Sequence, residues 1–475
     1  MKVAVYSHSI PPSVDGVARR MTSLLYELAK DGHEVFLFTL EKEPLLGDAA
    51  PPGSKPIRFA TLASTFLALY PTKRVGLPTF YNQLLIHSIM LREKPDVLHC
   101  TMDAMSPFLV LSAKLLNIPI VGSVHTDVME LLSTLGVWPM VGWAIGFKEA
   151  VESRLIDSCA TTSPSFQKKL CCRGVRCPNI IKTGVKVGLF TPQARSDEVR
   201  DRLTFGNPDG LLVVYVGRLG PEKRMDKLIQ MCASVDGVYL ALIGDGALGA
   251  RLAERHGCWT NQGNRRSRGG VYCRPKFLGH KDLAPVYATA DVHVSCSQFE
   301  TLGNTVLEAH ASGTTVVVPR AQGFIDTVDH EVDGFFFNGD RLQEGAAQLK
   351  RLRDDRALCR QMGERGRAKV QMQSPERVAQ DMMDWYVRTR ISLKVSLTGN
   401  AATEMVLRCL QALVSAFMVL VVIAFWNTTV GTHNFSRNFV RYCMHTRNAL
   451  GNSSFFNRIS NTYKALSNIP VQRDM

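Results

Sequence analysis

The sequence lacks a regular spacing pattern of cysteines. Its 12 cysteines are scattered along 475 residues, and none forms a C-x-x-C pair with a second pair at zinc-ligand spacing. Cys171, Cys172 and Cys177 make a local cluster without that spacing. We therefore expect no metal site and no disulfide scaffold, and the irregular cysteine pattern favours a reducing compartment.

Acidic residues are scarce in two basic segments, which account for most of the net charge of +14. Residues 255–276 contain six Lys or Arg and no acid, and residues 427–475 contain six against the single acid Asp474. The rest of the chain is close to neutral and offers no basic face for a phosphate backbone, so nucleic acid is not an expected partner. With 45% hydrophobic residues, the chain can form two folded domains and additional segments.

Charge is also absent from the run CLQALVSAFMVLVVIAFW at residues 409–426, which is long enough for a membrane span. We expect a transmembrane helix at residues 405–426, followed by a basic polar tail at 427–475. Arg408 would snorkel at one edge and Trp426 would lie at the other interface. A buried core helix is the alternative, but the run lies outside the two predicted domains, so no domain core remains for it to join.

Short apolar runs alternate with helical patterns, which is typical of parallel βαβ units. In the first half, strands are expected at residues 3–6, 34–39, 97–100, 118–123 and 158–162, and helices at 17–31, 107–116 and 143–156. In the second half, strands are expected at 211–216, 238–243, 276–279 and 292–295, and helices at 225–233 and 248–255. The pattern predicts two doubly wound α/β domains with a boundary in residues 184–209, a surface insertion at 257–275, and no targeting segment before the first strand.

The first chemical motif is the loop Val-Gly-Arg-Leu-Gly-Pro-Glu-Lys at residues 216–223, between a predicted strand and a helix. Free backbone N–H groups and the helix dipole at such a position attract phosphate, and Arg218 and Lys223 add full positive charge. Gly217 lies at the turn itself. A turn with merely solvated basic residues is the alternative when this motif is considered alone.

The second motif, Phe-Glu-Thr-Leu-Gly-Asn-Thr-Val-Leu-Glu-Ala at residues 299–309, also follows a strand and enters a helix. Glu300 and Glu308 are separated by about two helical turns, with residues 301–304 as the helix N-terminus between them. A carboxylate suits vicinal hydroxyls and bare N–H groups suit phosphate, so the motif fits a nucleotide sugar. Taken alone, it also fits a dipole-stabilising carboxylate and an exposed helical Glu.

Together, GR-x-x-x-EK, the IGDG at residues 243–246 and E-x7-E resemble the retaining glycosyltransferases of family four, which have the two-domain GT-B fold. The resemblance covers residues 1–393. It implies an N-terminal acceptor-side domain at 1–190, a nucleotide-sugar-binding domain at 191–375, and a crossover helix at 376–395. The roles that it implies are the donor ribose for Glu308, the donor sugar for Glu300, the pyrophosphate for Arg218 and Lys223, and the distal phosphate for backbone at Thr301, Leu302, Gly303 and Asn304.

In the first domain, the resemblance points to Gly16, in a glycine loop after the first strand, and to His125, after a central strand. The chain departs from the usual family pattern in two places. It has Asp15-Gly16 where many members have Gly-Gly, and residues 321–326 depart from the usual Gly-Gly-x-Pro-acid. No cofactor is implied, because the nucleotide sugar is itself the substrate.

Within the family, the pattern most resembles lipid glycosyltransferases, particularly the sulfoquinovosyltransferases that act on diacylglycerol. Phosphatidylinositol mannosyltransferases share much of it. The resemblance implies a retaining hexosyltransferase, with transfer of sulfoquinovose from UDP-sulfoquinovose to diacylglycerol as the first expectation and a related mannosyl or glucosyl transfer as the alternative. A lipid acceptor and a membrane are the expected partners.

Two other classes of protein are alternatives to a glycosyltransferase. Residues 244–249 match the dinucleotide pattern G-x-G-x-x-G, but a dehydrogenase also needs an acid about 20 residues onward, and residues 255–281 contain none. A non-catalytic membrane adaptor on an inactive transferase fold is the second class.

The expected location is a membrane, with a single span near the C-terminus and the catalytic domains facing the cytosol. N-x-S/T triplets at Asn427, Asn434 and Asn452 suit a lumenal tail, whereas basic residues on both sides of the span barely discriminate its orientation. The apolar stretch at residues 131–147, with Trp138 and Trp143, predicts either an interfacial contact or an ordinary buried helix.

Overall fold

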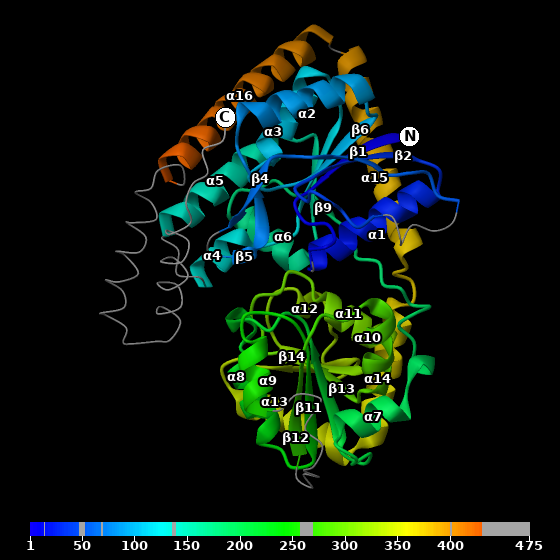
Figure 1. Cartoon of the computed structure of the whole chain (residues 1–475). Coiled ribbons are helices and arrows are strands. Elements are labelled where there is room, and N and C mark those ends of the chain that lie inside the picture. Colours follow the sequence, from blue (N-terminus) through cyan, green and yellow to red (C-terminus); the bar gives the residue numbers. More distant parts are fainter. Residues whose placement is uncertain are drawn as a thin grey trace.

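The structure is a computed structural model that describes residues 1–13, 15–46, 53–67, 70–134, 139–256, 269–399 and 401–429. It consists of two α/β domains stacked one above the other, each built around a parallel sheet with helices on both faces (Figure 1). The predicted fold of two doubly wound Rossmann-like domains is confirmed. The C-terminal helix predicted to be transmembrane is present as an apolar helix. Residues 257–268 of the predicted insertion at 257–275 and residues 430–475 of the predicted tail at 427–475 lie outside the described residues.

The first domain contains a seven-stranded sheet in the order β3-β2-β1-β6-β7-β8-β9, in which all paired strands are parallel. The strands are β1 (Lys2–Ser7), β2 (Glu34–Thr39), β3 (Arg58–Thr61), β6 (Val97–Thr101), β7 (Ile120–Val124), β8 (Ser158–Thr161) and β9 (Asn179–Ile180). A separate antiparallel hairpin joins β4 (Ser64–Leu67) and β5 (Tyr70–Gly76). Strands β1, β6 and β7 are buried along nearly their whole length, as expected when helices cover both sheet faces.

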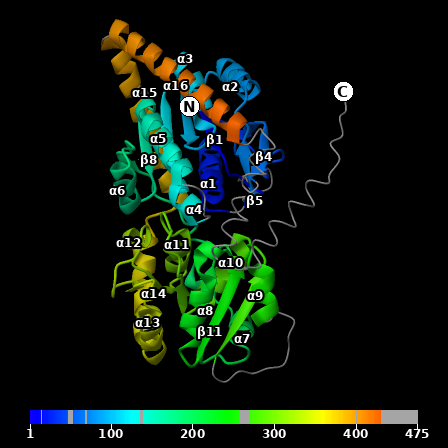
Figure 2. The ribbon, with the colours of Figure 1, turned by 90° about the vertical axis from the view of Figure 1, so that its left-hand side faces the viewer.

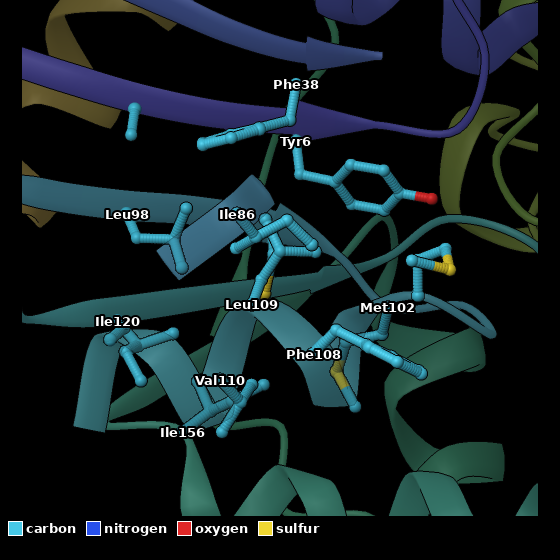
Figure 3. Close-up of a cluster of buried hydrophobic side chains, with 14 of the residues drawn as sticks. Tyr6, Phe38, Ile86, Leu98, Met102, Phe108, Leu109, Val110, Ile120 and Ile156 are labelled. Carbon is cyan, nitrogen blue, oxygen red and sulfur yellow. The ribbon is translucent and has the colours of Figure 1, made fainter. Parts of the chain in front are cut away.

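In the described residues of this domain, six helices accompany the sheet. They are α1 (Gly16–Lys30), α2 (Phe80–Glu93), α3 (Ser106–Leu115), α4 (Val128–Thr134), α5 (Pro139–Leu155) and α6 (Pro164–Cys172). On one sheet face, Tyr6 and Phe38 of the strands pack with Ile86 of α2 and Phe108 of α3 (Figure 3). This apolar contact fixes α2 and α3 against the sheet.

The second domain contains a six-stranded parallel sheet in the order β12-β11-β10-β13-β14-β15. Its strands are β10 (Leu211–Val216), β11 (Val238–Gly244), β12 (Gly269–Pro275), β13 (Val292–Val294), β14 (Thr315–Pro319) and β15 (Gly334–Phe337). Its helices are α7 (Asp197–Leu203), α8 (Met225–Ala233), α9 (Gly249–His256), α10 (His280–Thr289), α11 (Asn304–Ala311), α12 (Phe324–Thr327), α13 (Leu342–Asp354) and α14 (Arg356–Val370), with short 3₁₀ turns at Pro192–Ala194 and Pro221–Lys223.

Two local predictions were wrong in this domain. The strand expected at residues 276–279 is β12, Gly269–Pro275, so the surface insertion expected at 257–275 ends before Gly269. β12 pairs along its whole length with β11, and its Tyr272 and Cys273 are buried. Strands are recognised in sequence by apolar and β-branched runs. This short strand was missed because it begins with two glycines and follows a basic segment.

After the second domain, α15 (Pro375–Gly399) returns to the first domain and packs against α1. Its buried side chains belong to the cluster that also contains Val3, Leu25 and Val121. The buried members from α15 are Val378, Ala379, Met382, Met383, Trp385 and Tyr386. The indole N–H of Trp385 donates to Ser158 Oγ at 2.8 Å, so α15 is joined to β8 by a polar contact as well.

The apolar C-terminal helix α16 (Ala401–Thr429) lies along the first domain and packs mainly on α3 (Figures 1 and 2). Within the described residues it is the one helix that is long and apolar enough to cross a membrane, by length and composition, over Thr403–Ile423 with a mean hydropathy of 2.4. The prediction that this segment had no core to enter was wrong, because Val419 is 3% exposed and joins the core under α3.

Arg408 was expected to snorkel, and this expectation was also wrong. Its side chain is 3% exposed and Nη2 lies 3.1 Å from Asp157 Oδ1. Lys114 of α3 lies 2.8 Å from the same oxygen. A carboxylate that holds two cations from different helices anchors α16 to the body of the first domain.

Gly363 of α14 gives a test of the packing in the second domain. A Cβ added there would lie 1.9 Å from the carbonyl oxygen of Gly313. Gly to Ala in a helix normally stabilises by about 0.5–1 kcal/mol, but overpacking costs about 1–3 kcal/mol. We expect Gly363→Ala to lower the free energy of unfolding measured in urea.

Gly142 of α5 is the matched control, because a Cβ added there meets nothing within 4 Å. Gly142→Ala is expected to be neutral or slightly stabilising. A Gly363→Ala protein as stable as the wild type would contradict the described contact between α14 and the turn at Gly313.

Candidate active site

The carboxyl ends of the two parallel sheets face each other across the domain boundary (Figure 1). In the first sheet the strand order reverses between β1 and β6, and in the second between β10 and β13. Open parallel sheets bind ligands in the crevice outside such a reversal. The loops that carry the predicted site residues follow β1, β7, β10 and β13, so all of them lie at this boundary.

The loop after β10 places Gly217, Arg218 and Lys223 at the crevice. Lys223 Nζ lies 2.9 Å from Glu300 Oε2, and Arg218 Nη1 lies 3.7 Å from Glu222 Oε1. Gly217 has φ of 150°, and its carbonyl oxygen would lie 1.9 Å from a Cβ added at Gly244. The glycines after β11 therefore allow backbone to pack on backbone, which explains the G-x-G pattern without a dinucleotide.

The second motif is split between a loop and a helix. The prediction that the helix begins at Thr301 was wrong: α11 begins at Asn304, and Glu300, Thr301 and Leu302 precede it. Gly303 caps the helix with φ of 88°, a conformation that favours glycine. Consequently only Glu308 lies on the helix, while Glu300 is held in the loop beside Lys223.

Two helix N-termini meet across the boundary. Gly16 is the first residue of α1, and a Cβ added to it would lie 2.6 Å from Nδ2 of Asn304, the first residue of α11. The Thr301 hydroxyl donates to the His125 carbonyl oxygen at 2.9 Å, which adds a direct contact between the domains. Paired helix N-termini concentrate free N–H groups and positive potential, the properties that bind phosphate groups.

Glu308 is buried rather than an exposed helical carboxylate. Its Oε1 accepts a hydrogen bond from Arg19 Nη1 of α1 at 2.8 Å, and its Oε2 accepts one from the Tyr287 hydroxyl at 3.1 Å. Burial raises the pKa of Glu308, while the charge of Arg19 acts in the opposite direction. Glu308 of the second domain and Arg19 of the first therefore form an ion pair across the boundary.

His125 belongs to a chain of buried hydrogen bonds. Arg20 Nη1 lies 3.0 Å from His125 Nδ1, and since guanidinium only donates, Nδ1 must accept. His125 Nε2 then donates to Ser123 Oγ at 2.8 Å. Ser123 in turn contacts His99 Nε2 at 2.8 Å, and His99 Nδ1 lies 2.6 Å from the Tyr386 hydroxyl of α15.

Burial keeps both histidines of this chain neutral. It lowers the pKa of His99 to about 3. Burial, followed by the charge of Arg20, lowers the pKa of His125 well below its ordinary value. His125 is therefore a neutral ring whose tautomer is set by Arg20 and Ser123.

The sequence prediction missed Arg19, Arg20 and Tyr386. The two arginines follow Gly16 by one helical turn, so basic residues in the first turns of a phosphate-binding helix were an available signal. Tyr386 had none, because its contact with His99 joins residues that are 287 positions apart. Within the described parts of the chain, no group of three or more His, Cys, Asp or Glu lies close enough to hold a metal ion.

The sequence matches two glycosyltransferase families, one for each domain. Residues 200–369 match the glycosyl transferases group 1, and residues 14–189 match glycosyltransferase family 4. The fold and the opposed site loops define a two-domain GT-B glycosyltransferase. The chain belongs to the group 1 and family 4 glycosyltransferases, so the predicted family is confirmed.

Similar proteins support the same assignment. A GDP-mannose-dependent alpha-mannosyltransferase of Mycobacterium tuberculosis is 30% identical over 78% of this chain and 93% of its own length. The sulfoquinovosyl transferase SQD2 of Arabidopsis thaliana is 31% identical over 60% of this chain, which spans only 55% of that relative. The structure of Anabaena HepE in complex with UDP and glucose has a TM-score of 0.63 at 16% identity, covering 82% of this chain and 100% of that one.

These relatives establish the coarse activity. The protein is a glycosyltransferase that uses a nucleotide-sugar donor. The dehydrogenase interpretation of residues 244–249 is thereby replaced, and their glycines serve the packing of the loops after β10 and β11.

The buried neutral histidines give a pH prediction. An unfolded histidine has a pKa of about 6.5, so below that pH the unfolded chain binds protons that folded His99 does not. The stability held by neutral His99 is complete above about pH 6.5 and is lost as the pH falls toward its folded pKa of about 3. We expect His99→Gln to reduce the acid slope of the free energy of unfolding by up to about 1.4 kcal/mol per pH unit.

Urea unfolding at a series of pH values measures this slope. Val213→Ala, a fully buried change with no histidine, is the control: it should lower the whole curve without changing its slope. An unchanged slope in His99→Gln would show that His99 is not held neutral by burial.

Proposed function

We propose that this protein transfers a sugar from a nucleotide-sugar donor to a membrane lipid, with retention of configuration at the sugar. The observation that carries the proposal is the meeting of the α1 and α11 N-termini at the carboxyl ends of both sheets, with Lys223 held 2.9 Å from Glu300 in the loop that leads into α11. Such a position can hold a diphosphate and face an acceptor from the other domain.

The basic residues would act on the leaving nucleoside diphosphate. Negative charge grows on this group as the bond to the sugar breaks, and Arg218, Lys223 and the start of α11 are oriented before the reaction begins. Lys223 is paired with Glu300 at 2.9 Å. A donor phosphate that takes over Lys223 would free Glu300 to face the sugar, the role that the family resemblance implies for it.

Glu308 would hold the donor ribose. Both of its oxygens already accept hydrogen bonds, from Arg19 and from Tyr287. Ribose hydroxyls would therefore share or replace the Arg19 contact, which couples donor binding to the contact between the domains.

The ring nitrogens of His125 already contact Arg20 and Ser123. His125, as a neutral ring, would therefore bind at the acceptor side by exchanging one of these contacts for a substrate hydroxyl.

The most specific form of the proposal is transfer of sulfoquinovose from UDP-sulfoquinovose to diacylglycerol. The named activity of the Arabidopsis relative supports it. The GDP-mannose-dependent relative, which this chain matches over a larger share of both lengths, supports a mannosyl transfer as the second candidate. A screen of UDP and GDP sugars, with the lipid product identified by mass spectrometry, decides between them.

The membrane part of the proposal rests on the apolar helix Thr403–Ile423. We place the catalytic domains on the cytosolic side. The described cysteines, all of them free, fit a reducing compartment. The single crossing expected from the sequence would require α16 to leave the first domain, on which it packs.

Removal of the leaving-group charges should stop turnover. We expect Arg218→Ala with Lys223→Ala to lower kcat by about 100-fold or more, because the charges stabilise the diphosphate only as the bond breaks. Release of free nucleotide in the presence of acceptor measures the rate. Arg341→Ala, at a side chain that is 73% exposed, is the control and should retain wild-type turnover.

Near-normal turnover in a folded double variant would contradict this assignment of the site. Thermal unfolding monitored in parallel shows whether the variant is folded.

The lipid acceptor is tested by supplying donor with either diacylglycerol vesicles or soluble sugars and following the partition of the product. We expect product in the lipid phase. Transfer that needs no vesicles and gives only water-soluble glycosides would contradict the lipid acceptor while leaving the glycosyltransferase assignment intact.

A further inference from the structure

The first domain covers one face of α16, and the opposite face is apolar and exposed. The covered face contains Arg408, Ala412, Ser415 and Val419, at the spacing of one side of a helix. On the opposite face the exposed fractions are 59% for Val406, 54% for Leu410, 66% for Leu413, 64% for Phe417 and 52% for Leu420. We call these five residues the outer face of α16.

The outer face is unusual for a helix that is docked on a soluble domain. Such a helix normally presents charged and polar residues to water, and one that is apolar all round is covered on all sides. Residues 409–423 contain no charged side chain. Something apolar is therefore expected to cover the outer face.

Helix α5, which contacts α16, also has exposed aromatic side chains. Trp143 is 68% exposed and Phe147 is 56% exposed, and their rings stack with centroids 5.7 Å apart. The prediction of an ordinary buried helix here was wrong for these two residues. α5 contacts α16, and both helices face the viewer in Figure 2. Exposed aromatic residues beside an apolar helix suit the boundary between water and hydrocarbon.

The covered face indicates how α16 is oriented. Arg408 and Lys114 share Asp157, and Asp157 Oδ2 also accepts from the Ile120 backbone N–H at 2.8 Å. A helix that left the domain to cross a bilayer would break this buried cluster. It would also carry Arg408 away from its partner into or beside hydrocarbon, which is costly.

We propose that the outer face of α16, together with Trp143 and Phe147 of α5, docks on a lipid bilayer with α16 lying along the membrane surface instead of crossing it. This inference rests on the proposed function and deepens it, because a lipid acceptor has to be reached at a membrane. The five outer residues follow one stripe of a helix whose apolar segment has 21 residues, so the whole segment can lie at the interface.

An anionic leaflet fits this surface better than a second copy of the chain does. The sequence that follows the apolar run has six Lys or Arg against one acidic residue over positions 427–475. That charge attracts anionic headgroups and repels an identical chain. None of the five outer-face residues is charged. This face therefore offers no acidic group that could pair with the basic tail of a second copy.

Vesicle binding tests the surface. The full chain is sedimented with phosphatidylcholine vesicles that contain phosphatidylglycerol, without any donor. We expect Leu413→Gln with Phe417→Gln to weaken binding by about tenfold or more. Val332→Gln with Met372→Gln is the control: it removes two exposed apolar side chains of the second domain, which are 46% and 65% exposed, and should bind as the wild type does.

Wild-type binding by the α16 variant would overturn the proposal. A wild-type dimer that this variant converts to a monomer, with vesicle binding unchanged, would also overturn it and assign the outer face to a second copy. Because all four substituted side chains are exposed, the variants should keep the wild-type unfolding temperature.

The orientation is tested with membranes from cells that produce the full chain. An interfacial protein is released by alkaline carbonate, and its Asn434 and Asn452 triplets stay unmodified on the cytosolic side. Retention in the pellet together with glycosylation of these asparagines would overturn the in-plane arrangement in favour of a crossing. The same chain preceded by a cleavable secretion signal is the control that the triplets can be glycosylated.

Failure of this inference and failure of the proposed function give different results. Vesicle binding that depends on Leu413 and Phe417, combined with transfer only to soluble sugars, contradicts the lipid acceptor and leaves the docking surface. Transfer to lipid with vesicle binding independent of these residues contradicts the docking surface and leaves the proposed function.

Discussion

The first domain depends on a helix that the chain supplies only after the second domain is complete. α15 provides six buried side chains to the core that covers one face of the first sheet. Where the chain crosses between the domains, its two passages lie against each other: the Val185 N–H donates to the Gln373 carbonyl oxygen at 2.7 Å, and a Cβ at Gly184 would lie 2.6 Å from Pro375 Cα. The first domain is thus not a single continuous segment of sequence, and opening of the crevice has to turn about this pair of passages.

The same helix reaches the site. Tyr386 of α15 begins a chain of hydrogen bonds that runs through His99 and Ser123 to His125 and Arg20. Buried polar groups of this kind are stable only when each one is satisfied, and a satisfied chain fixes a single arrangement. The crossing helix therefore supports, through His99 and Ser123, the histidine at the crevice whose tautomer Arg20 sets. Arg19 pairs with Glu308 across the boundary, and Lys223 pairs with Glu300 within the second domain, so the charges of the site are balanced before any donor enters.

The elements and motifs that are determined by residues close together in the chain could be predicted from the sequence. The strands before the two motifs, the loop at Gly217 and the second-domain carboxylates follow from local apolar runs and from residue spacing. The ion pair of Arg19 with Glu308 could not be predicted, because it joins residues 289 positions apart and depends on how the domains face each other. The docking of α16 could not be predicted either. An apolar run has the same composition whether lipid or protein covers it, and only Arg408 with its partner Asp157 shows that one side belongs to the domain.

Helix α5 connects the two parts of the molecule that the proposed activity needs. Its outward residues Trp143 and Phe147 are apolar and exposed, whereas the next turns carry Lys148, Glu149 and Glu152 into the interior. Lys148 lies 2.6 Å from Glu152 and also donates to the carbonyl oxygen of Asp103, which follows β6 at the carboxyl edge of the first sheet. Burial raises the pKa of Glu149 to about 7. One helix thus joins an exposed apolar surface to a buried polar cluster at the carboxyl edge of the first sheet, where the candidate site lies.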